Sequence, residues 1–289
     1  ALKLAAWGNY FMVNCLAARL QQALAMVPQV RALVATAEPA GKGIGSLNTA
    51  ASLDQFEGYC WVWTGRLADG LAAYDLCIRQ ADVAGELAVF ARCHAVEAHC
   101  HRRDPQQAQE RARQAQAISV QLGEPPMLAA RVHQANGHAH LAAGRVADAI
   151  SAARAALAIH RRVDQTSAGP SAVLLAEALL AAGDNPGALA AATEAIVLCQ
   201  RSLRANYEAI AWGVQARALL RASGATAIAA AAAALDAADA LVTRTGALLL
   251  APALASWRAE WCAAQGDAAA QRQWLQQAER GRAQMGVLA

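Results

Sequence analysis

The stretch that decides the fold is residues 53–81, LDQFEGYCWVWTGRLADGLAAYDLCIRQA. It predicts two helices, Leu53 to Thr64 and Leu67 to Ala81, joined by a short turn at Gly65-Arg66. Glycine is a common turn residue. Gly70, five residues after the turn glycine, would let two antiparallel helices approach closely. The stretch therefore predicts a helical hairpin.

The same pattern occurs seven times along the chain. The turns are centred on Ala18, Gly65, Arg103, Gly144, Gly183, Gly224 and Gly266, and successive turns lie 38 to 47 residues apart. Small residues dominate the positions five residues after each turn, which are Ala23, Gly70, Ala108, Ala149, Ala188, Ala229 and Gln271. A period of about 40 residues indicates stacked units rather than one globular core. We therefore expect an all-α fold, a right-handed α-solenoid of about seven hairpins and fourteen helices.

The composition supports one helical body. Of the 289 residues 56% are hydrophobic, with many Ala and Leu, which are strong helix formers. The unbroken period favours a single superhelical domain over residues 1–289. Because the chain opens on helical sequence without Met, we interpret it as a fragment of a longer protein. The fifth hairpin is expected from about Pro170 to Gln200, and one long connection is expected from Glu38 to Asn48.

Charge and hydropathy exclude several partners. The net charge of +3 comes without a dense Lys/Arg run, so nucleic-acid binding is not expected. The longest runs without charge, Leu4 to Ala18 and Ala222 to Leu235, are shorter than the 18 or so residues that cross a bilayer. Seven cysteines show no paired spacing and favour free thiols in a reducing cytoplasm. We expect a cytoplasmic protein that does not contact a membrane.

Two hairpins resemble the tetratricopeptide repeat (TPR) family. The Gly, aromatic, small, aromatic and small positions of that family are matched by Gly58, Trp61, Gly70, Tyr74 and Cys77, and less closely by Gly137, His140, Ala149, Ala153 and Ala156. The interval here exceeds the family's usual 34 residues. Longer repeats of this kind resemble those attached to bacterial signalling ATPases. The resemblance implies a superhelix that binds other proteins.

The last 40 residues resemble a narrower group. The stretch Gly246 to Gly286, with Pro252, Leu254, Arg258, Glu260 and Gly266-Asp267, is similar to the C-terminal end of repeat regions in bacterial adenylate/guanylate cyclases that carry an ATPase module. This resemblance implies a regulatory, non-catalytic scaffold attached to a signalling enzyme. The alternative is the effector-sensing TPR domain of a maltose-activator-type, LuxR-like transcriptional regulator, in which a DNA-binding domain follows the repeats.

The candidate binding residues line the first helix of each middle hairpin. Counting back from the turns gives the residues expected to face the concave groove, namely Gln55, Tyr59, Glu97, Arg131, Gln134, His138 and Glu177. Such a mixture of side chains suits a groove that recognises a peptide or a partner helix. The alternative is that these side chains are merely solvated. The oligomeric state is left open.

Histidines cluster on two adjacent hairpins, at His94, His99, His101, His133, His138 and His140. Imidazoles on neighbouring helices can bind Zn²⁺, but no pair has i, i+4 spacing and no acid stands at a metalloprotease position. We therefore expect no metal and no cofactor, and interpret the cluster as groove lining or packed core, although the sequence leaves metal binding open.

No motif indicates catalysis. Glu97 and Glu177 are isolated acids rather than a catalytic pair, and no Ser-His-Asp or Cys-His arrangement is recognisable. The stretch Gly41 to Ser46 fails the phosphate-loop pattern and is expected to be an inter-unit loop. Trp257 and Trp261, four apart, favour core packing over an exposed patch. The chain is expected not to be an enzyme.

Overall fold

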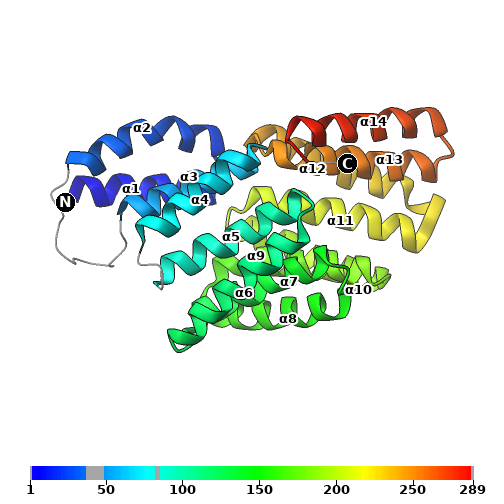
Figure 1. Cartoon of the computed structure of the whole chain (residues 1–289). Coiled ribbons are helices and arrows are strands. Elements are labelled where there is room, and N and C mark those ends of the chain that lie inside the picture. The colour runs from blue at the N-terminus through cyan, green and yellow to red at the C-terminus, as the bar shows by residue number, and fades with distance from the viewer. Residues whose placement is uncertain (1, 37–48, 82–84, 288–289) are drawn as a thin grey trace.

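The computed structural model describes residues 2–36, 49–81 and 85–287. Within these residues every regular element is helical, as Figure 1 shows. The first six α-helices are α1 (Leu2–Leu16), α2 (Leu20–Thr36), α3 (Thr49–Trp63), α4 (Leu67–Gln80), α5 (Glu86–His101) and α6 (Pro105–Gln121). The next four are α7 (Pro126–Ala142), α8 (Val146–Val163), α9 (Gln165–Ala181) and α10 (Asn185–Arg201). The last are α11 (Ala205–Ser223), α12 (Ile228–Thr245), α13 (Ala251–Ala264) and α14 (Ala268–Gln284), with short 3₁₀ helices η1 (Gly224–Ala227) and η2 (Leu248–Leu250).

Consecutive helices pair into seven hairpins, which we call units one to seven, so the predicted right-handed helical solenoid is confirmed. The predicted connection from Glu38 to Asn48, which includes the Gly41 to Ser46 stretch, lies entirely outside the described residues.

All seven predicted turn residues have a positive φ angle. The φ angles are 55° at Ala18 and 59° at Arg103, and they lie between 54° and 87° at the five glycines. In unit two the reversal is closed by backbone bonds from Gly65 N to Val62 O (2.9 Å) and from Arg66 N to Trp61 O (2.8 Å). This is the usual way in which a helix end satisfies its free carbonyl groups, and glycine adopts it without a steric penalty.

The small residues after the turns do allow close helix approach. A Cβ atom added at Gly70 would lie 2.4 Å from Val62 Cγ2 and 2.9 Å from Gly58 O. Ala108, Ala149 and Ala188 are completely buried. At this spacing only a hydrogen or a methyl group fits between the paired helices.

Unit six corrects the predicted spacing. Ala229 was expected at the helix crossing, but it is exposed. The extra residues of η1 delay the start of α12 by two positions relative to the other units, so that Ala231 and Ala238 are the buried residues instead. The prediction counted residues from the turn as if they were all α-helical. A 3₁₀ turn advances the chain further per residue than an α-helix does, so the count selects the wrong alanine.

The start of unit five was also predicted too late. α9 begins at Gln165, and Asp164 caps it by accepting a hydrogen bond from Thr166 N at 3.1 Å. Pro170 therefore lies inside the helix rather than at its start. An aspartate cap stabilises the start of a helix by accepting hydrogen bonds from its free amide groups. Here this stabilisation exceeds the cost of the backbone hydrogen bond that Pro170 cannot donate.

Trp257 belongs to the core, as predicted. It is 8% exposed and packs directly over Gly213, where an added Cβ would lie 2.2 Å from the indole ring. Trp261 is half-buried, and its Nε1 donates a hydrogen bond to Ile228 O at 3.0 Å. The two tryptophans thus join α13 to α11 and α12.

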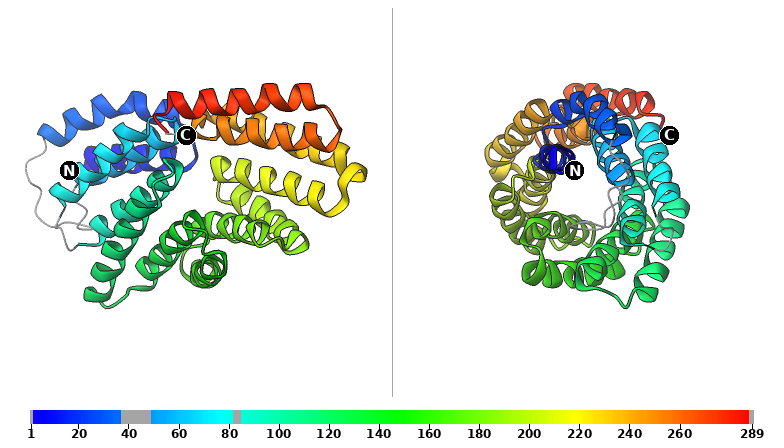
Figure 2. Two further views of the ribbon diagram at one scale, coloured as in Figure 1. Left: turned by 45° about the vertical axis from the view of Figure 1, so that its right-hand side comes forward. Right: turned by 90° about the vertical axis from the view of Figure 1, so that its left-hand side faces the viewer.

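The superhelix brings its two ends together. Figure 2 shows the hairpins following one another around a ring, so that units one and two meet units six and seven. One continuous core cluster includes Leu20 and Trp63 from the first units and Leu249 and Val287 from the last. A Cβ at Gly65 would lie 3.4 Å from Met285 Sδ. We call this contact between the ends the seam.

By length and composition alone, one helical stretch among the described residues, Ala205–Thr245, is apolar enough to cross a membrane. In the structure it is not one straight helix, because the chain turns at Gly224 between α11 and α12. Ala216, Ala231 and Leu235 from this hairpin pack against α13. Part of the apolar surface is therefore buried by packing between helices.

Candidate functional site

The predicted groove residues lie on α3, α5, α7 and α9, the inner helices of units two to five. Four of them are buried rather than solvated. Their exposed fractions are 4% for Gln55, 2% for Tyr59, 9% for Glu97 and 4% for Gln134. The other three, Arg131, His138 and Glu177, are half-buried. The inner surface is thus partly filled by its own side chains.

Tyr59 is buried because α11 packs against α3. The Asn206 side chain donates a hydrogen bond from Nδ2 to the Tyr59 hydroxyl at 2.7 Å. Close to it, the rings of Trp63 and Tyr207 meet edge to face with centroids 5.0 Å apart. Burial raises the pKa of Tyr59 far above its ordinary value, so its hydroxyl stays protonated. Tyr59 therefore has a structural role on the inner wall.

The side chain of Glu97 also contacts α11. The Tyr207 hydroxyl donates to both carboxylate oxygens of Glu97, each at 3.1 Å. Burial raises the pKa of Glu97 to about 7, and the bond from Tyr207 and the nearby Arg131 guanidinium only partly oppose this rise. Near neutral pH, Glu97 is therefore present in both protonation states.

Arg131 and Glu177 place opposite charges beside Glu97. Arg131 Nη1 donates to Gln134 Oε1 at 3.0 Å, which holds the guanidinium along α7. Burial and the negative charge of Glu97 together raise the pKa of Glu177 to about 7, and Arg217 partly opposes this shift. The structure therefore brings three predicted residues, Glu97, Arg131 and Glu177, into one electrostatic cluster.

Gln55 and the buried histidines extend this inner wall. Gln55 Nε2 lies 3.3 Å from His94 Nδ1, and His94 stacks on the Tyr74 ring. Burial lowers the pKa of His101 to about 4, while burial together with His101 and Arg131 lowers that of His138 to about 3. These imidazoles are neutral at pH 7 and can accept a hydrogen bond.

Metal binding finds no support in the arrangement of the histidines. Within residues 2–36, 49–81 and 85–287, no group of three or more His, Cys, Asp or Glu side chains is placed to hold a metal ion. The seven cysteines are free thiols, and the Sγ atoms of Cys15 and Cys60 lie 3.3 Å apart in the core between units one and two.

Sequence reasoning missed Asn206 and Tyr207, the residues that close the inner surface. They lie at the start of α11, 18 and 17 residues before the turn at Gly224, whereas the predicted groove residues lie six to thirteen residues before their turns. Their partners, Tyr59 and Glu97, are more than 100 residues away in sequence. No local motif marks such a contact. The polar Asn-Tyr-Glu run at the start of α11 is the one feature from which sequence reasoning could have started.

The comparisons with known proteins were negative at the level of sequence. No family model matches the chain, and no curated protein matches it. Comparison with solved structures, in contrast, finds clear similarity of fold.

Three similar structures are Rap proteins. The Rap conjugation gene regulator of plasmid pLS20, in complex with the Phr* peptide, has a TM-score of 0.73 at 13% identity, over 96% of this chain and 72% of that one. The apo form of RapI has a TM-score of 0.63 at 11% identity, over 98% and 99% of the two chains. A Rap protein complexed with Competence and Sporulation Factor has a TM-score of 0.61 at 10% identity, over 99% of each chain. At these identities the similarity shows a TPR-like helical repeat fold.

Proposed function

We propose that this chain is a non-catalytic regulatory domain that binds a peptide or a helix of a partner protein on its inner surface. The observation that carries the proposal is the set of half-buried polar side chains Arg131, His138 and Glu177 on the inner helices α7 and α9. Two of the similar Rap structures contain a peptide or a factor according to their names, which supports the same kind of ligand here.

The chemistry of the inner surface suits a peptide. Arg131 offers a guanidinium to a carboxylate or a carbonyl group, and Glu177 offers a carboxyl group to an amine or an amide. His138 Nε2 and Asn206 Oδ1 are buried without a hydrogen-bond partner among the described residues. Both atoms are hydrogen-bond acceptors, and they make the wall behind the inner surface polar.

Several residues that carry the resemblance to bacterial cyclases stabilise unit seven and its contact with unit six. Pro252 lies beneath Gly281, Arg258 pairs with Asp236 at 2.6 Å, and Asp267 caps α14. In keeping with that resemblance, we propose that the chain is the C-terminal region of a cytoplasmic bacterial signalling enzyme of the nucleotidyl cyclase/ATPase type. The alternative remains an effector-sensing domain of a maltose-activator-type regulator. A cyclase or ATPase module encoded upstream favours the first, and a helix-turn-helix encoded downstream favours the second.

Selection from a random peptide library tests the binding proposal without knowledge of the partner. Peptides would be selected on the parent chain, and their affinities would be compared among Arg131→Ala, Glu177→Ala and the control Arg154→Ala. Arg154 is exposed on α8 and has no ion pair among the described residues.

The expected result is binding that weakens by about 1–2 kcal/mol in each inner-surface variant and is unchanged in the control, which is the usual contribution of an interface anchor. Selected peptides that bind all four proteins equally would refute the assignment. Circular dichroism checks that the variants stay folded. Because Tyr59 and Glu97 support the fold, their alanine variants are unsuitable for this test.

A further inference from the structure

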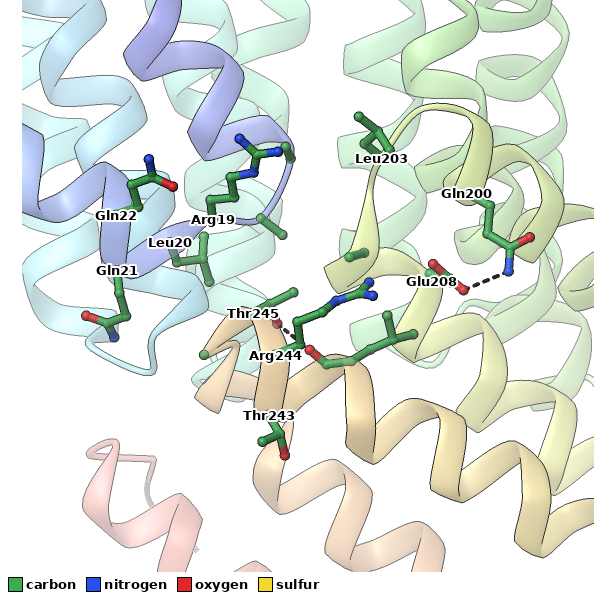
Figure 3. Close-up of a pocket in the computed structure, with 15 residues that line it drawn as sticks. Arg19, Leu20, Gln21, Gln22, Gln200, Leu203, Glu208, Thr243, Arg244 and Thr245 are labelled. Carbon is green, nitrogen blue, oxygen red and sulfur yellow. Dashed lines mark hydrogen bonds between the residues drawn. The ribbon is translucent and has the colours of Figure 1, made fainter.

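A cavity lies at the seam, away from Arg131, His138 and Glu177 on the inner surface. It has a volume of about 810 Å³ and lies between the α1–α2 turn of unit one and the ends of α10, α11 and α12 in units five and six. Figure 3 shows the residues that line it. Its size falls within the range of small-molecule sites in proteins, about 300–1,000 Å³.

Two arginines from different units line this cavity. Arg19 comes from the α1–α2 turn and Arg244 from the last turn of α12, and Figure 3 shows Arg244 extending into the space between the two walls. Among the described residues, neither guanidinium has an ion-pair partner. Arg31, Arg111 and Arg217 elsewhere in the chain are, by contrast, each paired with a carboxylate.

Most of the remaining polar lining is uncharged, with side chains that can donate or accept hydrogen bonds. Gln21, Gln22 and Thr243 can each donate a hydrogen bond. The one acidic residue in the lining is Glu208, and its Oε1 already accepts hydrogen bonds from Gln200 Nε2 (2.9 Å) and Trp212 Nε1 (3.3 Å). The cavity therefore has two unpaired positive charges and one negative charge that is already hydrogen-bonded.

A guanidinium binds an oxyanion through two parallel hydrogen bonds, so two guanidinia on facing walls can hold a ligand between them. We propose that the seam cavity binds a small molecule bearing carboxylate or phosphate groups, with Arg19 and Arg244 as its main contacts. Such a ligand touches units one and six together. Because it binds only when these units are in contact, it stabilises the closed superhelix.

Isothermal titration calorimetry with two probes, pyrophosphate and citrate, tests this site. Ionic strength is held constant across the titrations, since exposed charges are strongly screened by salt. The variants are Arg19→Gln and Arg244→Gln, with Arg154→Gln as a control that removes the same charge from a distant exposed site on α8. All three changed residues are exposed, so the fold should be retained, and circular dichroism checks this.

The expected result is saturable binding of at least one probe, with affinity at least tenfold lower in both seam variants and unchanged in Arg154→Gln. Tighter binding of pyrophosphate identifies a phosphate ligand, and tighter binding of citrate identifies a carboxylate ligand. The proposal is overturned if neither probe binds saturably, or if the seam variants bind as the parent does. The peptide selection described above is independent of this outcome because it uses residues on α7 and α9.

Discussion

Replacement of Gly70 by alanine tests the packing on which every unit depends. The added methyl group would lie 2.4 Å from Val62 Cγ2, 2.9 Å from Gly58 O and 3.1 Å from Val62 N. The Val62 methyl can move when its side chain rotates. The other two atoms belong to the backbone of α3, so the two helices must move apart to accommodate the new group.

The size of the effect follows from two opposing terms. Overpacking of a tight contact costs about 1–3 kcal/mol, and the upper end applies here because backbone atoms cannot rotate away. Alanine is favoured over glycine in a helix by about 1 kcal/mol. The net destabilisation is therefore about 2 kcal/mol. For a chain of this length, that lowers the melting temperature by about 3 °C.

Thermal melting followed by circular dichroism at 222 nm measures this shift, and Gly8→Ala is the matched control. Gly8 lies in α1, and an added Cβ there meets nothing within 4 Å. The same substitution should therefore stabilise the protein at Gly8 by up to about 1 kcal/mol. A melting temperature of Gly70→Ala equal to or above that of the parent would refute the close approach of α3 and α4. This conclusion does not depend on the melting temperature of Gly8→Ala.

Three further outcomes are expected. Ala149 is completely buried between α7 and α8, so Ala149→Leu should lower stability by about 1–3 kcal/mol in urea unfolding, and an unchanged midpoint would contradict the assigned spacing. Tyr59→Phe leaves Asn206 Nδ2 buried without its partner and should cost about 1–3 kcal/mol, whereas parental stability would mean that α3 and α11 do not meet there. Burial raises the pKa of Glu97 from its ordinary 4.5 to about 7, so the folded protein holds this proton more tightly than the unfolded chain does, and stability falls as pH rises from about 4.5 to 7. The stability of Glu97→Gln relative to the parent should therefore increase across that interval and level off above it. The histidines with lowered pKa titrate in the opposite sense in both proteins and cancel in this difference. Loss of the Glu97 charge also lowers the pKa of Glu177 in the variant, which adds to the expected rise. A difference that stays flat with pH would refute the buried position of Glu97.

The inner surface was predictable only in part. The count back from the turns selected Glu97, Arg131 and Glu177, which lie on α5, α7 and α9, because helical periodicity and the repeat together predict which face each side chain occupies. It could not show that Tyr59 is buried, since burial depends on α11, which is more than 140 residues further along the chain. Whether a partner binds these residues stays a prediction.

What the sequence alone determines about this protein is local. The five turn glycines with positive φ and the tight crossing at Gly70 follow from the short-range sterics of glycine. The repeat spacing also predicts turns at Ala18 and Arg103, whose side chains do not favour positive φ. The two-residue delay at η1 shows where even this local rule fails. Only the tertiary structure decides that the first and last units meet, because the superhelical turn accumulates from small rotations between neighbouring hairpins that no single motif specifies. That closure positions Tyr59 against Asn206 and creates the seam cavity beside Arg19 and Arg244.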